Sequence, residues 1–225
     1  MRPHVLINVA ISADGKLSTR ERRQVKISGR TDFERVDHLK ASCDAVMVGI
    51  GTVLADDPSL TVKSADLIAE RVRSGKPEHP VRIVIDSRGR LPPDAKILHK
   101  GLGKRIVAVT ESVSPDRISV LSPYADIILA GSRQVDLEIL LERLYEAGIR
   151  RLMVEGGGTL IWGLFSAGLV DEISTFVGNM IIGGKDAPTL ADGEGFVTEN
   201  HFPRLYLDSV TPLDEGVMIH WKVIK

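Results

Sequence analysis

Short apolar runs rich in valine and isoleucine recur along the chain, and glycine, proline or aspartate bounds most of them. Apolar runs of this length indicate β-strands that are covered on both faces, because a strand with one exposed face would alternate apolar and polar residues. The runs cover residues 5–11, 45–50, 81–85, 106–109, 127–130 and 152–154. We therefore expect a sheet of buried strands over the first two thirds of the chain.

Helical periodicity separates several of these runs, with apolar residues three or four positions apart. Residues 31–42 are the first such segment, with Thr31 or Asp32 as the expected N-cap. Its apolar stripe consists of Phe33, Val36, Leu39 and Cys43. Similar patterns follow Asp136 and Thr159, the expected caps of two further helices, and each pattern ends at a glycine. Strands that alternate with helices predict an α/β fold.

The last third of the chain has strand patterns without a helix that could cross from one strand to the next. These strands are residues 172–182, 205–210 and 217–223. Consecutive strands without crossovers usually pair antiparallel. We therefore predict a single α/β domain over residues 1–225, with a mixed, mostly parallel central sheet, flanking helices and antiparallel strands at its C-terminal end. Residues 64–79 and 99–104 are rich in Gly, Lys, Glu and Pro, which indicates surface connections.

Composition and charge exclude several classes of protein. The 225 residues include 29 basic and 30 acidic side chains, so the net charge of −1 gives no overall basic field for non-specific nucleic-acid binding. Only 4% of residues are aromatic, which leaves few rings to stack on single-stranded bases. The single cysteine, Cys43, can form neither an internal disulfide nor a thiolate zinc cluster, and the six histidines lack the spacing of metal ligands. We expect a core thiol at Cys43, no metal and no nucleic-acid partner.

The sequence has no apolar run of the roughly 18 residues that a membrane-spanning helix needs. Its N-terminal residues lead directly into a predicted strand instead of a signal peptide. These two features predict a cytoplasmic protein that does not bind membranes.

The most specific local motif is a glycine loop at residues 154–159, where a predicted strand ends and a predicted helix begins. Three consecutive glycines cost conformational entropy, and their missing side chains let the main chain approach a ligand closely. The N–H groups and the positive dipole end of the following helix would face that ligand, with the hydroxyl of Thr159 as a further donor. The loop therefore predicts a phosphate-binding site, and a tight turn followed by a helix cap is the alternative.

Two other loops follow predicted strands and carry groups suited to a nucleotide. Residues 49–58 hold two glycines, the hydroxyl of Thr52 and the carboxylate of Asp56, but lack the third glycine of a dinucleotide-binding fingerprint. Residues 86–92 hold two arginines, whose guanidinium groups can bind phosphate oxygens in a bidentate manner. The second loop therefore fits the ribose phosphate that distinguishes NADPH from NADH. A capped short helix and a solvated basic turn are the respective alternatives.

Several motifs, taken in order along the chain, resemble those of riboflavin-pathway reductases. They are residues 12–16, 48–62, 86–88 and 154–160, extended by residues 168–172 and 183–188. This family comprises the reductases of archaea and fungi that act on 2,5-diamino-6-ribosylamino-pyrimidinone 5′-phosphate. It is related to the reductase half of the bacterial bifunctional deaminase-reductases. The resemblance covers nearly the whole chain.

The resemblance implies a dihydrofolate-reductase-like fold, a homodimer and NADPH as the hydride donor. In that family the ribosylamino group opens to an imine, and hydride delivered to the sugar C1′ gives a ribitylamine. The residues implied to bind NADPH are Ala10, Thr52, Asp56, Ser87, Arg88, Arg90, Gly156, Gly157, Gly158, Thr159 and Leu160. The residues implied to face the substrate are Lys40, Leu60, Lys63 and Glu155. The two lysines stand where bacterial relatives tend to have arginine, which keeps the charge but loses the bidentate geometry.

Protonation makes an imine a better electrophile. Our hypothesis is therefore that Glu155, or a water ordered by Glu155 or Asp14, supports the proton during ring opening. One cysteine is too few for a zinc deaminase domain of the bacterial type, which indicates a stand-alone reductase. A reductase of the deaminated substrate, a dihydrofolate reductase and a non-catalytic NADPH-binding sensor are the alternatives. The glycine loop and the basic N-terminal loop favour a phosphorylated sugar over a pterin.

Overall fold

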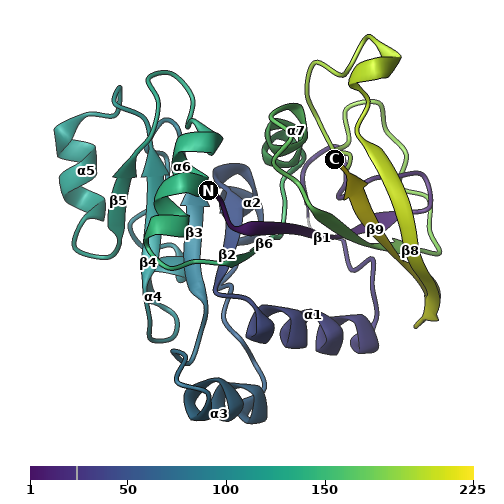
Figure 1. Cartoon of the computed structure of the whole chain (residues 1–225), viewed down its shortest axis with the longest axis horizontal. Coiled ribbons are helices and arrows are strands. Elements are labelled where there is room, and N and C mark those ends of the chain that lie inside the picture. The colour runs from purple at the N-terminus through teal and green to yellow at the C-terminus, as the bar shows by residue number, and fades with distance from the viewer. Residues whose placement is uncertain (24) are drawn as a thin grey trace. The chain divides into compact units, whose positions relative to one another are not determined.

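The computed structural model describes residues 1–23 and 25–225, which form two compact units (Figure 1). Unit 1 consists of Met1–Pro3 and Asp37–Met153, and unit 2 consists of His4–Val36 and Val154–Lys225. Helix α1 (Arg30–Ser42) and strand β6 (Arg151–Val154) have residues in both units. Every other described helix and strand lies within one unit.

Unit 1 contains parallel strands. They are β2 (Ala45–Gly49), β3 (Val81–Ile85), β4 (Arg105–Val109) and β5 (Asp126–Leu129), and the strand order is β5-β4-β3-β2-β6. Gly49 pairs with Ile85, and Ile85 pairs with Ala108, so the residues that follow β2, β3 and β4 emerge at the same edge of the sheet (Figure 1). The predictions for these four strands are confirmed to within one residue.

The core of unit 1 consists of strand residues and the apolar face of α6 (Leu137–Glu146). Leu140, Leu141 and Leu144 of this helix are fully buried. The side chain of Asp136 accepts the N–H of Ile139 at 3.0 Å, so the predicted cap of α6 is confirmed. The other helices that lie wholly in unit 1 are α2 (Ile50–Asp56), α3 (Ala65–Arg73), α4 (Lys96–His99) and α5 (Pro115–Leu121). No helix of the described residues is long and apolar enough to cross a membrane.

The prediction of a surface connection over residues 64–79 is wrong, because helix α3 forms there. Its buried positions are Leu67 and Arg71. The guanidinium group of Arg71 donates to the carbonyl oxygens of Ala41, Cys43 and Pro77. A charged residue with main-chain partners thus occupies a buried helical position, and a search for apolar periodicity does not detect such a helix.

Unit 2 combines parallel and antiparallel pairing. Its strands are β1 (His4–Ser12), β7 (Glu172–Gly178), β8 (Arg204–Leu213) and β9 (Gly216–Ile224), in the order β1-β7-β9-β8. Strands β1 and β7 are parallel, whereas β7 with β9 and β9 with β8 are antiparallel. Helix α7 (Gly158–Ser166) and a short 3₁₀ helix, η1 (Glu199–His201), also lie in this unit. The predicted mixture of mostly parallel strands with antiparallel strands at the C-terminal end is confirmed.

Helix α1 begins at Arg30, but its cap is not local. The carboxylate of Asp214, from the turn between β8 and β9, accepts the N–H groups of Thr31 at 3.2 Å and Asp32 at 3.0 Å. A Cβ on Gly29 would lie 2.5 Å from the carboxyl carbon of Asp214, so the glycine makes room for this cap. The prediction that Thr31 or Asp32 caps the helix is wrong, because a residue 182 positions from Asp32 supplies the acceptor.

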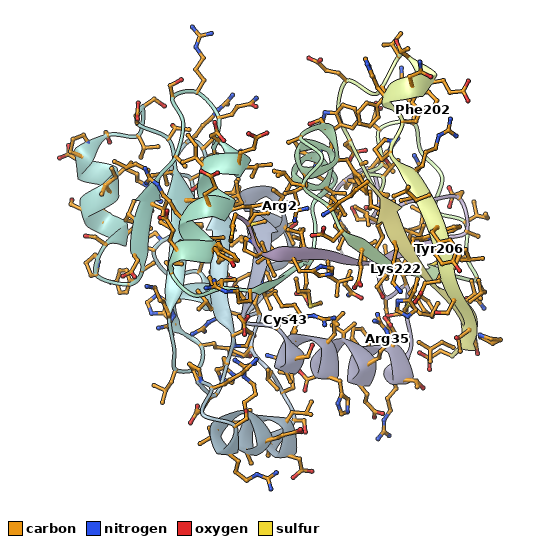
Figure 2. The ribbon with its side chains drawn as sticks, viewed as in Figure 1. Arg2, Arg35, Cys43, Phe202, Tyr206 and Lys222 are labelled. Carbon is orange, nitrogen blue, oxygen red and sulfur yellow. The ribbon has the colours of Figure 1, made fainter. Side chains whose placement is uncertain are left out.

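The predicted apolar stripe of α1 is also partly wrong. Phe33 is 54% exposed, whereas the carboxylate-bearing Asp32 and Asp37 are buried. Arg35, which pairs with Asp32 at 2.8 Å, donates to the side chain of Asn8 at 2.7 Å and to Ser174 at 3.1 Å (Figure 2). The inward face of α1 is therefore largely polar, and hydrogen bonds to β1 and β7 hold its N-terminal half in unit 2.

Candidate active site

In unit 1, the segment after β2 forms the short helix α2, which carries Thr52 and Asp56. Both side chains are half-buried, and burial raises the pKa of the Asp56 carboxyl. A Cβ on Gly51 would meet no atom within 4 Å, so there is open space beside the first turn. The short-helix alternative for this loop is therefore correct as a description of its conformation. A hydroxyl and a partly desolvated carboxylate remain available there to hydrogen-bond a ribose or an amide.

The segment after β3 is a tight loop built around Asp86. This carboxylate is fully buried; its Oδ2 accepts the N–H of Leu91 at 2.7 Å, and its Oδ1 lies 3.8 Å from Nε of Arg90. Gly89 adopts a positive φ of 64°, which a glycine accommodates without steric cost. As a result, Arg88 and Arg90 are exposed beyond the end of β3, whereas Asp86 is buried.

Two residues that the sequence analysis did not select hold this loop in place. Arg117 of α5 donates to the carbonyl oxygens of Gly89 and Leu91. Thr110, which follows β4, donates its hydroxyl to the carbonyl oxygen of Ser87 at 2.7 Å. All three acceptors are main-chain carbonyl oxygens far away in sequence, so no local pattern identifies Arg117 and Thr110.

The hydroxyl of Ser87 has a structural role. Its Oγ accepts the N–H of Val135 at 3.1 Å, which ties the loop to the segment before α6. The hydroxyl hydrogen can still be donated to a ligand, because accepting one bond does not use it.

In unit 2, the glycine loop follows β6. Glu155 is half-buried, and Gly156 adopts a φ of 112° with no atom within 4 Å of the position of a Cβ. Helix α7 then begins at Gly158, with Gly157 as N-cap and no side-chain hydrogen bond at that cap. The prediction that Thr159 caps this helix is wrong, because Thr159 lies inside the first turn and is exposed.

Gly158 serves packing within the chain. A Cβ at this position would lie 2.6 Å from Oδ2 of Asp192 and 2.6 Å from the carbonyl oxygen of Thr189. Asp192 in turn accepts the hydroxyl of Thr189 at 2.6 Å, and its N–H donates to the carbonyl oxygen of Gly158 at 3.0 Å. The third glycine of the loop thus lets residues 189–192 contact the start of α7, whereas Gly156 borders open space.

Near the end of β1, Ala10 is half-buried and pairs with Phe176 of β7. Asp14 follows in the next turn, where it accepts the hydroxyl of Ser12 at 2.6 Å and the N–H groups of Ile182 at 3.0 Å and Gly183 at 2.7 Å. These hydrogen bonds, that of Ser12 above all, lower the pKa of Asp14 to about 2. Asp14 is therefore ionised near neutral pH, which argues against it as a source of a proton.

The family of RibD C-terminal domains matches residues 3–219 of the chain. The chain belongs to the RibD C-terminal domain family. A protein of Archaeoglobus fulgidus named 2,5-diamino-6-ribosylamino-4(3H)-pyrimidinone 5′-phosphate reductase is 50% identical over 197 residues, which are 88% of this chain and 90% of that relative. The protein of the same name from Methanothermobacter thermautotrophicus is 44% identical over 223 residues, 99% of each chain.

A solved structure of RibD from Acinetobacter baumannii matches this RibD C-terminal domain with a TM-score of 0.80 at 26% sequence identity. The match covers 100% of this chain and 59% of that chain, so the present chain spans little more than half of the bacterial protein. The dihydrofolate-reductase-like fold and the resemblance to riboflavin-pathway reductases are thereby confirmed. Because the relatives are reductases by name, membership of the family implies a nicotinamide cofactor.

The chemistry of the residues in this RibD C-terminal domain fits such a cofactor. In unit 1, the hydroxyls of Thr52 and Ser87 and the exposed guanidinium groups of Arg88 and Arg90 are donors suited to phosphate and ribose oxygens. In unit 2, the N-terminus of α7 offers main-chain N–H groups next to the open space at Gly156. Leu160, by contrast, is only 8% exposed, so its main chain is the part suited to a ligand.

The residues implied to face the substrate lie partly in unit 1. Lys63 donates its ammonium to the hydroxyls of Ser59 and Thr61, each at 2.7 Å, and Leu60 between them is buried with a φ of 54°. Lys40 is half-buried in the last turn of α1. The remaining residue of this group, Glu155, belongs to unit 2. Cys43 is buried, so the prediction of a core thiol is confirmed, and burial raises the pKa of that thiol.

Proposed function

We propose that this protein is an NADPH-dependent reductase that converts the ribosylamino group of 2,5-diamino-6-ribosylamino-pyrimidinone 5′-phosphate into a ribitylamino group in riboflavin biosynthesis. The observation that carries the proposal is the 50% identity, over 88% of this chain, to an archaeal relative of that name. Phosphate-binding chemistry in both units supports it, since cofactor and substrate are both phosphorylated.

Preference for NADPH over NADH is supported by the loop after β3. In Rossmann-type folds an acidic side chain hydrogen-bonds the ribose 2′-hydroxyl of NAD, and an arginine accommodates the 2′-phosphate of NADP. Here the acidic residue, Asp86, is fully buried and bonded to the N–H of Leu91. The side chains that reach solvent are those of Arg88 and Arg90, which match the charge of a ribose phosphate.

The reaction requires ring opening of the ribosylamine to an imine, followed by transfer of one hydride to C1′ and one proton to the nitrogen. NADPH supplies the hydride when bound, and the protein mainly orients the two reactants. Glu155 is the proposed group that supports the proton, because it is a half-buried carboxylate beside the glycine loop. The proposed substrate contacts are Lys40, Leu60 and Lys63, and the proposed contact of the nicotinamide is Ala10.

The proposed assembly is a homodimer in which β8 lies at the interface. Strand β8 is the last strand in the order of unit 2, so one of its edges has no partner within the described chain. Exposed apolar or aromatic side chains gather on β8 and just before it: Phe202, Leu205, Tyr206, Leu207 and Val210. Figure 2 labels Phe202 and Tyr206 in this region. An exposed edge strand with such residues favours association.

We also propose a single reductase domain and a cytoplasmic location.

Absorbance at the NADPH band tests the function directly. The purified protein should oxidise NADPH only when the ribosylaminopyrimidine phosphate is present, and the product should gain two hydrogens in mass. The deaminated analogue and dihydrofolate, run in parallel, test the alternative substrates. Binding of NADPH, seen as thermal stabilisation, without oxidation of NADPH would support a sensor instead.

Glu155→Gln should slow single-turnover reduction and change its pH profile. An unchanged profile would contradict the role of Glu155 in proton transfer.

A further inference from the structure

Asp37 of α1 is a buried carboxylate, 9% exposed, that the substrate and cofactor sites described above do not include. Its two oxygens accept main-chain N–H groups at the end of the segment that connects α2 to α3. The N–H of Lys63 donates to Oδ1 at 2.8 Å and to Oδ2 at 3.0 Å, and the N–H of Ser64 donates to Oδ2 at 2.8 Å. The two main-chain donors are 26 and 27 positions from Asp37 in sequence, and all three residues belong to unit 1.

The segment that Asp37 holds, residues 57–64 between α2 and α3, has an unusual backbone. Asp57 and Leu60 adopt φ angles of 43° and 54°, which side-chain-bearing residues rarely populate. Such conformations persist only where surrounding contacts fix them, and Asp37 supplies contacts at the C-terminal end of the segment. On the same segment, the hydroxyls of Ser59 and Thr61 lie 3.0 Å apart, and each accepts the ammonium of Lys63 at 2.7 Å. One ammonium and two hydroxyls form a compact set of donors for an anion.

Asp37 also connects this set of donors to a second lysine. Lys40 lies three residues after Asp37, and residues three apart share a face of a helix. We propose that Asp37 is a positioning residue for the substrate site, because it fixes the segment that carries Lys63 and Leu60 against the face of α1 that carries Lys40. This inference rests on the proposed function, in which both lysines face the phosphorylated substrate.

A carboxylate suits this role better than its neutral isostere. Asp37 accepts three close contacts from two N–H groups and donates none. In Asp37→Asn one of the two oxygens becomes an NH₂ group, which cannot accept an N–H. At most two of the three contacts can then remain, and in either orientation of the amide its NH₂ group faces the N–H of Lys63, donor against donor. The segment would then be less ordered in the free protein. Substrate binding would have to order it, and the free energy that this costs would weaken substrate binding.

The experiment measures steady-state kinetics of the full chain with NADPH and the ribosylaminopyrimidine phosphate. Asp37→Asn should raise KM for the substrate about ten-fold, while kcat and KM for NADPH change less than about three-fold. Asp44→Asn is the matched control. Asp44 is also a carboxylate in unit 1 that accepts two main-chain N–H groups, those of Arg150 and Arg151, both at 3.0 Å. It should lower the melting temperature without raising KM for the substrate.

A double-mutant cycle distinguishes positioning from general destabilisation. If Asp37 acts through Lys63, then Asp37→Asn should raise KM much less in a Lys63→Met background than in the wild type. Asp37→Glu is the second variant in case the asparagine variant does not fold; it keeps both acceptors, and its longer side chain should still raise KM several-fold.

Two results would overturn the inference: an unchanged KM for the substrate in both Asp37 variants, or equal effects of Asp37→Asn in the wild-type and Lys63→Met backgrounds. Failure of the wild-type protein to oxidise NADPH with this substrate would instead contradict the proposed function itself. The two failures are thus distinguishable.

Discussion

Single carboxylates of this protein stabilise loops by accepting main-chain N–H groups from distant segments. Asp14 bonds Ile182 and Gly183, Asp44 bonds Arg150 and Arg151 at the start of β6, and Asp214 bonds the first turn of α1. Each of these carboxyls has a pKa below its usual range, and for Asp14 and Asp214 the hydrogen bonds are the main cause. For Asp44, burial acts to raise the pKa, but the hydrogen bonds from Arg150, Arg151 and Lys76 together with the charge of Lys76 outweigh it. Stability should therefore depend on pH through these residues.

Asp14 should contribute fully to stability only above about pH 4. Its pKa falls from an ordinary value of 3.8 to about 2 on folding, so its contribution is complete above the unfolded pKa and is lost as the pH falls through about 2. We expect Asp14→Asn to lower the melting temperature at pH 7, and the difference from the wild type to shrink between about pH 4 and pH 2. Asp186→Asn, at an exposed position nearby, is the control and should change the melting temperature little. A pH-independent difference for Asp14→Asn would contradict the expectation.

Gly158, the first residue of α7, should not tolerate a side chain. Since a Cβ there would lie 2.6 Å from atoms of Asp192 and Thr189, we expect Gly158→Ala to lower the free energy of unfolding by about 1–3 kcal/mol. Gly51→Ala is the matched control, because its Cβ would meet nothing within 4 Å and alanine favours a helix. Urea unfolding of both variants measures the change in the free energy of unfolding. Equal decreases in the two variants would be inconsistent with the packing role of Gly158.

At the scale of elements, the loop after β3 shows how a short segment acquires one conformation. Asp86 bonds Leu91 within the loop, while Arg117 of α5 and Thr110 after β4 bond its carbonyl oxygens from outside. The two exposed arginines therefore project from a rigid base, which lowers the entropy lost when a ligand binds.

Removal of those arginines should affect one cofactor selectively. Arg88→Ala combined with Arg90→Ala should raise KM for NADPH about ten-fold to a hundred-fold, because charge-assisted hydrogen bonds to a phosphate are lost, and should change KM for NADH little. Arg73→Ala, in the last turn of α3, is the control for loss of an exposed positive charge. Equal increases for both cofactors would remove the two arginines from phosphate recognition.

At the scale of the whole molecule, the exposed residues of β8 stand out. Tyr206 is 61% exposed and Val210 is 52% exposed, on a strand that pairs only with β9 among the described strands. We expect the wild-type protein to sediment as a dimer and the variant with Tyr206→Asp and Val210→Asp to sediment as a monomer, because charged groups on an apolar interface must be desolvated. Val72→Asp, at an exposed position of α3, should remain dimeric. A monomeric wild type would contradict the proposed assembly.

The sequence by itself determined most of the strands, the mixed pairing and the helix that follows Asp136. These features depend on signals between neighbouring residues: apolar runs, helical periodicity and a cap three residues from its partner. The ordered motifs were also sufficient to identify the family, because each of them, such as the glycine loop or the arginine loop, is a continuous stretch of sequence. The roles of the individual site residues stay predictions.

Only the tertiary structure decided which side chains hold these loops in place. The cap of α1 comes from Asp214, one of the two buried positions of α3 is filled by Arg71, and the segment with Lys63 is held by Asp37. In each case a polar side chain is satisfied by main-chain atoms of a segment far away in sequence. Main-chain donors and acceptors are the same at nearly every residue, so no sequence pattern marks which of them will be the partner.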